Sequence, residues 1–470
     1  MTVVQILILA GFAILLGLLR RGRSLALMGA SALAIYWLQP QGSPFSFWFP
    51  TLTLALTALA WAVAAPSEAR GLRQNWPALA VLFGVSLAVA LPSRLPLEAR
   101  LFPPPGSLRI LVAALGVVFA LVILLSSLRG GHRPLLTFGA LILIVIFVFL
   151  KSPALPRGAL TFLDNLRGRA PDPKTLVNFA WLGYSYLAFR ILHTLRDRQD
   201  GLLPAVGLAE YVNYVIFFPS FTAGPIDRLE RFIKDLRVPL PLANDDMLFA
   251  GQRLALGLFK KFFVADLLAL VSVNDALIAQ TRSGGWLWLE LFAYTLRVYF
   301  DFSGYTDIAI GTARLLGVRL PENFDAPFLK PNLAQFWNAW HMTLTQWFRA
   351  YFFNPFNRAL RSAKRPLPAW LMILLTQVTT MLLIGLWHGV TWNYALWGLW
   401  HGIGLFLQNR WSEFVRRRFP DLGAGPVSRR VFHAGGAALT FVYFSLGMAF
   451  FALSTPRLSL AAFMKLFGIS

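Results

Sequence analysis

Two histidines, His341 and His388, lie in stretches of large aromatic residues, and imidazole is the side chain that most readily exchanges a proton near neutral pH. His388 lies where two apolar runs meet, 371–386 and 390–407, and His341 directly follows Trp340. An ionisable side chain at membrane depth is costly and by default faces a cavity or the interior of a helix bundle. The alternative is that each is a core histidine whose ring nitrogens bond to backbone carbonyls.

The sequence lacks the signatures of several other chemistries. None of its 470 residues is cysteine, which excludes thiol nucleophiles, disulfides and thiolate metal sites. It contains no Gly-x-Ser-x-Gly elbow, no glycine-rich phosphate loop and no His-Glu-x-x-His motif. Two histidines alone make a poor metal site, so we expect no metal and no tightly bound cofactor. What remains is general acid–base catalysis, such as removing a proton from a hydroxyl that attacks an activated acyl carbonyl.

Two carboxylates lie inside the apolar segment 297–311. Arg297 and Asp301 are four residues apart, a helical ion-pair spacing that indicates a structural role for Asp301. Asp307 has no oppositely charged residue three or four positions away, so it stays a candidate for the site.

A third histidine, His401, follows His388 by thirteen residues. At about 100° per residue, two side chains at that separation on one helix face directions about 140° apart. If one helix holds both residues, we expect them not to line the same cavity.

Two prolines and a glycine follow an apolar run in the segment 217–228. The pattern predicts a helix end that turns through irregular backbone, which membrane depth tolerates only where that backbone is buried in protein or lines a cavity. A plain interfacial loop fits the segment equally well. Lys260 and Lys261 lie among aromatic residues and indicate an interfacial anchor whose aliphatic stems are buried.

The elements that position these residues follow from composition. Apolar residues make up 57% of the chain and charged residues 14%, against roughly a quarter charged in soluble domains, and the mean hydropathy is +0.60. The sequence therefore predicts an all-α, polytopic integral membrane protein with about a dozen spans, between 11 and 13. The expected spans lie near residues 3–19, 25–38, 46–65, 77–92, 109–126, 135–150, 176–192, 206–222, 248–273, 286–315, 369–386, 390–408 and 431–453, with some middle ones broken, re-entrant or interfacial. The first is expected to be a retained helix rather than a signal peptide.

Arginines predict the orientation of the N-terminal spans in a cytoplasmic membrane. The first loop is basic while the loop 38–45 carries no charge, which places the first loop in the cytoplasm. Alternation places the later basic clusters on that side too, and the residues concerned are Arg20, Arg21, Arg23, Arg70, Arg73, Arg129, Arg133, Arg190, Arg196 and Arg198. The net charge of +22 fits basic loops facing anionic lipid, or the docking of an acidic soluble partner, and indicates no nucleic-acid partner.

The chain divides into four segments that differ in how many motifs they contain. Residues 1–150 are hydrophobic spans that we interpret as a scaffold, and residues 151–174, rich in Pro, Gly, Arg and Asp, are expected to form a loop. The motifs concentrate in a core at 175–410, which is followed by a C-terminal span and tail at 411–470.

The motifs in that core resemble the membrane-bound O-acyltransferase family. The resemblance covers about residues 180–410, and its motifs agree in order and spacing, at 218–228, 257–261, 300–307, 324–328, 336–349 and 385–402. The residues of these motifs are most similar to those of the teichoic-acid D-alanyltransferase branch, and next to those of the alginate O-acetyltransferase branch. Ala339 and Ala350 depart from that branch's usual basic and acidic residues, and the N-terminal spans are more numerous than expected for it.

The resemblance implies a ring of helices around a funnel, with a tunnel that joins a cytoplasmic acyl donor to an outer acceptor. It implies that His388 is the catalytic base and His341 a second required polar residue. The candidate tunnel or supporting residues are Trp387, Trp340, Asn393, Trp337, Asp307 and Ser303.

We therefore expect acyl transfer, D-alanyl first and acetyl next, from a cytoplasmic thioester to a hydroxyl of an envelope glycopolymer. The donor would be a phosphopantetheine carrier protein or an acyl-CoA, and an extracytoplasmic partner is a further expectation. The alternative is a proton-coupled transporter or flippase, which would use buried histidines and broken spans in a different way. Inverted repeats would favour that alternative, and the sequence shows none.

Overall fold

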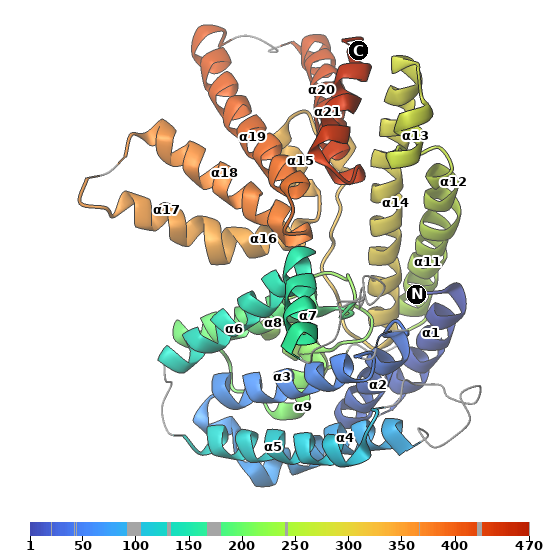
Figure 1. Ribbon diagram of the computed structural model, residues 1–470, viewed down its shortest axis with the longest axis vertical. Helices are drawn as coiled ribbons and strands as arrows, with labels where there is room; N and C mark the ends of the chain where they lie inside the picture. Colours follow the sequence, from blue (N-terminus) through green and yellow to red (C-terminus); the bar gives the residue numbers. More distant parts are fainter. Residues whose placement is uncertain are drawn as a thin grey trace. The chain divides into compact units, whose positions relative to one another are not determined.

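The computed structural model shows an all-α protein, as the composition predicts (Figure 1). The described residues are 1–19, 21–41, 43, 45–91, 105–128, 133–166, 180–239, 243–365, 367–420 and 425–469. Within these ranges the chain forms helices and no strand, and Phe324 forms an isolated antiparallel bridge with Trp340. Arg20, Arg129 and residues 167–174 of the expected loop lie outside the described residues.

Two compact units make up the chain: residues 1–254 with 308–321, and residues 255–307 with 322–470. The helices of the first unit are α1 (Val3–Gly17), α2 (Arg23–Leu38), α3 (Trp48–Ala64), α4 (Leu72–Ala90), α5 (Leu108–Ser127), α6 (Arg133–Lys151), α7 (Ala154–Leu166), α8 (Tyr184–Gln199), α9 (Leu208–Val215) and α10 (Leu229–Arg237). The helices of the second unit are α12 (Ala265–Ala269), α13 (Asp275–Gln280), α15 (Leu333–Ala339), α16 (Met342–Phe348), α17 (Asn354–Arg361), α18 (Ala369–His388), α19 (Trp392–Arg418), α20 (Pro426–Ala452) and α21 (Pro456–Leu466). Residues of α11 (Asn244–Phe259) and α14 (Gly284–Leu315) belong to both units.

Four helices in the described ranges, α5, α6, α18 and α20, are long and apolar enough to cross a membrane. The shorter apolar helices α1, α2 and α3 match the expected spans near 3–19, 25–38 and 46–65. The expectation of a loop over 151–174 was wrong in part, because residues 154–166 form α7. This helix is amphipathic, but its Pro and Gly residues are more typical of a loop, so the sequence pattern did not indicate a helix.

The expected span at 206–222 is also shorter than predicted. Helix α9 ends at Val215, and irregular backbone follows until α10 begins at Leu229. Nearly all residues from 216 to 227 are buried or half-buried, so this segment is the protein-buried turn of the two alternatives and not an exposed loop.

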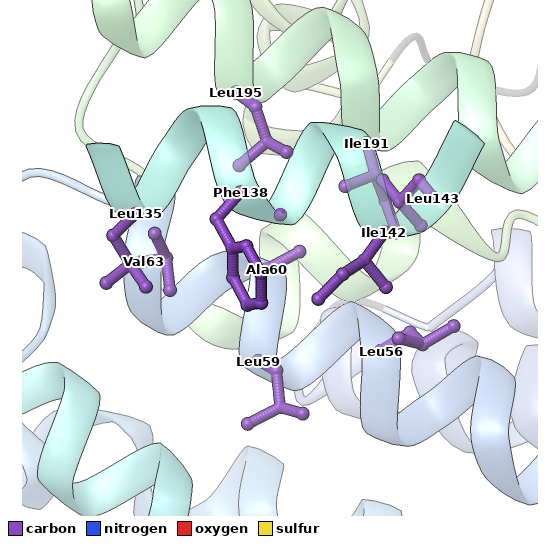
Figure 2. A pocket seen from close by; sticks show the side chains of 11 residues that line it. Leu56, Leu59, Ala60, Val63, Leu135, Phe138, Ile142, Leu143, Ile191 and Leu195 are labelled. Carbon is purple, nitrogen blue, oxygen red and sulfur yellow. The ribbon is translucent and has the colours of Figure 1, made fainter. Parts of the chain in front are cut away.

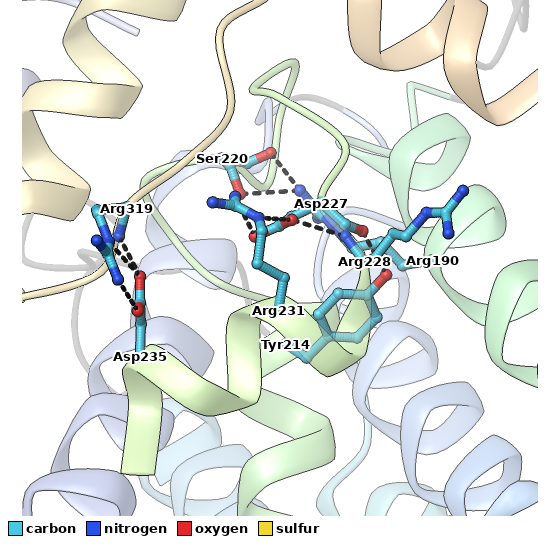
Figure 3. A network of polar contacts seen from close by, with 8 residues as sticks. All are labelled: Arg190, Tyr214, Ser220, Asp227, Arg228, Arg231, Asp235 and Arg319. Carbon is cyan, nitrogen blue, oxygen red and sulfur yellow. Dashed lines mark hydrogen bonds and ion pairs between the residues drawn. The ribbon is translucent and has the colours of Figure 1, made fainter. Parts of the chain in front are cut away.

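Arg190 stabilises this buried turn (Figure 3). Its guanidinium donates to the carbonyl oxygens of Val215, at 3.1 Å, and Ser220, at 2.7 Å, and to Ser220 Oγ at 2.9 Å. The side chain is only 1% exposed, so it is not the cytoplasmic loop cation that the sequence suggested. A buried charge is tolerated when hydrogen bonds replace its lost hydration, and here the carbonyls of irregular backbone do so.

Helices α18 and α19 form a tight hairpin, with backbone packed against backbone (Figure 1). Glycines make this possible: a Cβ on Gly398 would lie 2.5 Å from the Met381 carbonyl oxygen, and one on Gly385 would lie 2.2 Å from the Tyr394 carbonyl oxygen. Small residues at such contacts are the usual means by which membrane helices approach closely. The hairpin fixes the C-terminal end of α18, where His388 lies.

Candidate functional site

A cavity of about 50 Å³ in the second unit is bounded by both sequence-predicted histidines. The lining residues are Val298, Phe302, Trp337, Trp340, His341, Leu344, Thr345, Ile384, His388, Trp397, Phe444, Met448 and Phe451. The space exceeds the roughly 10–15 Å³ that one water needs, so it has room for polar chemistry in an otherwise apolar surrounding. It thus places His341, His388, Trp337 and Trp340 at one place in the fold.

His388 is the last residue of α18 and is half-buried. Aromatic rings surround it: its centroid lies 4.6 Å from that of Trp387, 4.8 Å from that of Phe451 and 5.5 Å from that of Trp397. Helix α19 begins at Trp392, where the Thr391 hydroxyl caps the helix by accepting from the Tyr394 amide. The imidazole is therefore held at the tip of a hairpin, next to the cavity.

His341 has an unusual backbone conformation, with φ +42° and ψ +53°, in the left-handed region. For an L-residue this costs roughly 1–2 kcal/mol, and such strain persists where surrounding contacts impose it. The contacts come from the preceding connector: the Asp325 amide donates to the Ala339 carbonyl at 3.0 Å, and the Met342 amide to the Asn323 carbonyl at 2.9 Å. Ala326, with φ +41°, shares this conformation.

Asn323 completes the clamp around His341. Its side-chain oxygen accepts from the Thr343 hydroxyl at 2.6 Å and from the Thr343 amide at 3.3 Å, and the residue is fully buried. Four hydrogen bonds thus fix the chain on both sides of His341. Their combined free energy outweighs the strain of its left-handed backbone.

The ring of His341 is buried, at 4% exposed, against Phe302 and Trp387. Both of its nitrogens lack a hydrogen-bond partner within the described part of the chain. Buried polar atoms are nearly always satisfied, and an exception calls for a functional or solvent partner. The structure thus does not support the alternative of a core histidine bonded to backbone carbonyls at this position.

Two indole N–H groups beside the cavity also lack a hydrogen-bond partner. Trp337 and Trp397 both line it, both are buried, and Nε1 of each has no partner among the described residues. Trp397 also contacts His401, at 4.8 Å between ring centroids, as does Trp337 at 5.1 Å.

His401 lies behind the cavity and is not part of its lining. It is fully buried, and its nitrogens also lack partners in the described ranges. His388 and His401 lie on different helices, because residues 389–391 separate α18 from α19. The expectation that His388 and His401 do not share a cavity holds nonetheless.

The remaining candidates lie outside the lining. Trp387 contacts the rings of both His341 and His388. Asn393 donates to the Leu453 carbonyl at 2.5 Å, which ties the start of α19 to the end of α20. Ser303 is buried, and its hydroxyl has no partner in the described chain.

Asp307 forms a buried ion pair with Lys260, at 2.7 Å. The expected pairing of Asp301 with Arg297 was wrong, since Asp301 accepts from Lys261 at 2.5 Å instead. Both lysines begin a π-helical turn, Lys260–Val264, which offers two consecutive side chains to α14. Neither lysine is the free interfacial anchor that the sequence suggested.

A second cavity, of about 180 Å³, shares Trp337, Thr345 and Ile384 with the first. Its lining includes Asn338 and Arg349, whose side chains are hydrogen-bonded to each other. In the described residues, no three His, Cys, Asp or Glu side chains come together to hold a metal ion.

Sequence reasoning missed Asn323, Thr343 and Trp397. Asn323 had a usable signal, since Asn in a turn-rich connector often bonds to nearby backbone. Thr343 and Trp397 had none, because their roles depend on which distant residues they meet.

Residues 160–450 match the sequence profile of the membrane-bound O-acyltransferase family, and the chain belongs to that family. Similar characterised proteins include the teichoic acid D-alanyltransferase of Streptococcus thermophilus, 33% identical over 247 residues, which are 51% of this chain and 58% of that protein. The teichoic acid D-alanyltransferase of Bacillus subtilis is 32% identical over 240 residues, 50% of this chain and 60% of that protein. The probable alginate O-acetylase AlgI of Pseudomonas syringae pv. tomato is 35% identical over 217 residues, 46% of this chain and 40% of that protein. The matched part thus spans two fifths to three fifths of these relatives.

Proposed function

We propose that the protein transfers an acyl group from a thioester to a hydroxyl, with His388 as the general base. The observation that carries this proposal is the cavity that His341 and His388 both line. Family membership supports the reaction class, and the two unsatisfied indole N–H groups supply donors for a carbonyl oxygen.

In this mechanism the His388 imidazole removes the proton of the acceptor hydroxyl as its oxygen attacks the thioester carbonyl. The tetrahedral intermediate carries its negative charge on the former carbonyl oxygen, and an N–H of Trp337 or Trp397 would stabilise it. Collapse breaks the carbon–sulfur bond, and the thiolate takes the proton back from the imidazolium. The products are an ester and a thiol, and the base is regenerated.

The two histidines differ in burial, which supports different roles. His388 is half-buried and can carry a transient positive charge, whereas His341 is almost inaccessible. A charge on a fully buried imidazole is costly, so His341 serves as a neutral donor or acceptor that orients a substrate.

For the substrates we favour a D-alanyl group passed to an envelope polymer outside the membrane, with an acetyl group next. The D-alanyltransferases and the alginate O-acetylases among the similar proteins support these two in that order. The donor would be a carrier-protein thioester or an acyl-CoA on the cytoplasmic face. The neighbouring cavity, lined in part by Asn338 and Arg349, offers polar groups that could bind the phosphopantetheine arm of such a donor.

The test is acyl transfer by the full-length protein in proteoliposomes, with D-alanyl or acetyl thioesters on one side and a polyol polymer on the other. We expect His388→Ala to lower transfer by at least about 100-fold, the typical contribution of a general base. The matched control is His433→Ala, because His433 is exposed and bonds to the Leu329 carbonyl away from the cavity. Normal transfer by His388→Ala would overturn the assignment. Polymer movement without ester formation in the wild type would favour the transporter alternative.

A further inference from the structure

Helices α3, α6 and α8 enclose an apolar groove of about 180 Å³ in the first unit (Figure 2). Each helix contributes a stripe of side chains spaced along one face. The stripes are Leu56, Leu59, Ala60 and Val63 on α3, Leu135, Phe138, Gly139, Ile142 and Leu143 on α6, and Ile191 and Leu195 on α8. From Leu56 to Val63 the groove follows about 10 Å of helix, at 1.5 Å per residue.

Helix α6 exposes the groove to its surroundings. It is one of the four helices that can cross a membrane, and only 11% of its apolar window is buried. Phe138 and Ile142 are exposed at the groove, at 59% and 38%. Gly139 keeps the middle open, since a Cβ there would reach Leu195 at 3.6 Å. The groove is therefore open toward the hydrocarbon that surrounds α6.

The groove has a polar end. Figure 2 shows Val63 close to Leu135 at one end of the groove, with Leu56 toward the other end. Beyond the first end, each of the three chain segments carries an arginine: Arg70 follows α3, Arg133 begins α6, and Arg198 lies one turn beyond Leu195 on α8. The three arginines therefore gather at the same end of the groove.

Contacts between these segments place the guanidinium groups near one another. Arg133 donates to the Gln199 carbonyl at 3.5 Å, and the Gln199 amide donates to Thr137 Oγ1 at 3.0 Å. The charge of Arg198 acts on Arg70, and the charge of Glu68 acts on it in the opposite sense. The hydrogen bonds of Gln199 hold the start of α6 beside the end of α8. The interaction of Arg198 with Arg70 shows that the end of α8 is also near the end of α3.

The positive charge at this end is only partly balanced within the described part of the chain, where Glu68 acts on Arg70 and Asp200 on Arg196. Arg196 is paired with Asp200 at 3.1 Å, but Arg70, Arg133 and Arg198 form no ion pair with any described carboxylate. Arg70 is buried and bonds to carbonyl oxygens, at 2.6 Å for Ala65 and 3.1 Å for Leu128. An anion placed beside Arg133 and Arg198 would be attracted by both and would offset the repulsion between Arg198 and Arg70.

We propose that this groove binds an anionic phospholipid, with one acyl chain between α3, α6 and α8 and the phosphate at Arg133 and Arg198. The excess of arginine in these loops predicts that this end faces the cytoplasm, where anionic lipids attract arginine. A guanidinium recognises phosphate with paired hydrogen bonds, and the apolar stripes remove the acyl chain from contact with other lipids. The site is remote in sequence from the histidines and does not depend on the proposed reaction.

The experiment uses the full-length protein in nanodiscs of phosphatidylglycerol and phosphatidylcholine in a 1:4 ratio, followed by native mass spectrometry of retained lipid. We expect the wild type to keep one phosphatidylglycerol preferentially. Gly139→Leu fills the groove, and we expect the preferential retention of phosphatidylglycerol to be lost, because the acyl chain loses its packing contacts between α6 and α8. The double variant Arg133→Gln/Arg198→Gln should lose the preference for phosphatidylglycerol while it stays folded.

The matched controls are Gly116→Leu on α5, where a Cβ meets no atom within 4 Å, and Arg73→Gln at the start of α4. Both should retain phosphatidylglycerol like the wild type. Equal retention of the two lipids by the wild type would overturn the proposal, and so would unchanged retention in the Gly139 and arginine variants. Loss in the controls as well would reject a site at this groove.

Discussion

His341 and His388 line the same cavity, and the indole of Trp387 contacts both of their rings, at 6.1 and 4.6 Å between centroids. The two reach this position from different helices, since His341 precedes α16 and His388 ends α18. The short α16 depends on a clamped connector and α18 on a glycine-lined hairpin. The cavity is thus assembled from two separately stabilised parts, and each part can be tested by itself.

The left-handed backbone of His341 predicts a difference between two substitutions that both remove the imidazole. His341→Gly should leave the protein more stable than His341→Ala by up to about 1 kcal/mol, because glycine adopts positive φ without strain but has more freedom when unfolded. Both variants should lose acyl transfer. The measurement is the thermal unfolding midpoint in detergent, followed by tryptophan fluorescence, together with transfer activity. An Ala variant at least as stable as the Gly variant would refute the strain at this position.

The unsatisfied indole of Trp337 predicts a catalytic effect from removing one N–H group. Trp337→Phe keeps an aromatic ring at the cavity, and we expect kcat to fall by about 100-fold with little change in KM, as for other donors to a developing oxyanion. Trp392→Phe is the control, because Trp392 is 78% exposed. A kcat unchanged by Trp337→Phe would exclude this indole as the donor.

Two neighbouring ion pairs between the π-helical turn and α14 predict unequal effects on stability. Asp307 is 4% exposed in its pair with Lys260, whereas Asp301 is 52% exposed in its pair with Lys261. Asp307→Asn should cost roughly 3 kcal/mol, because it leaves a partly buried ammonium without its counter-charge, while Asp301→Asn should cost less than about 1 kcal/mol. Chemical denaturation of the two variants in the same detergent measures the difference. Equal losses would show that burial does not distinguish the pairs.

The ion pair of Asp235 with Arg319, at 3.0 Å, predicts a pH dependence of stability (Figure 3). Burial raises the pKa of the Asp235 carboxyl, but hydrogen bonds and the charge of Arg319 lower it more, so the net pKa lies below its ordinary value. A lowered folded-state pKa stabilises the fold above the unfolded value of about 3.9, and this contribution is lost as pH falls through the lower folded-state pKa. Thermal midpoints measured from pH 7 to pH 3 should fall more for the wild type than for Asp235→Asn. Parallel curves for the two proteins would contradict this.

The sequence predicted the all-α membrane class and pointed to the two histidines that line the cavity, because both features depend on local signals. Long apolar runs predict membrane helices, and an imidazole within such a run is unusual enough to stand out at His388 and His341. The irregular turn after α9 was also predictable, since Pro219, Gly224 and Pro225 interrupt a helix wherever they lie.

Partnerships between distant residues were not predictable in the same way. Local spacing suggested Arg297 as the partner of Asp301, but the π-helical turn brings Lys261 to it from forty residues away. Arg190 resembled a loop cation in sequence, and only the fold shows the carbonyls of Val215 and Ser220 that surround it. Asn323 lies in a turn-rich connector where a local bond to backbone is expected, but its partners, Met342 and Thr343, lie about twenty residues away along the chain.

The cavity beside His388 has a volume of about 50 Å³, which is room for a few water molecules at roughly 10–15 Å³ each. The thioester and the hydroxyl of the proposed reaction are together larger than that, so rings that line the cavity would have to move apart to admit them. In the proposed reaction, rings such as those of Trp337 and Phe451 would shift before the substrates meet His388. If that ring movement limited the rate, the solvent deuterium isotope effect would be near unity, although the proposed step transfers a proton.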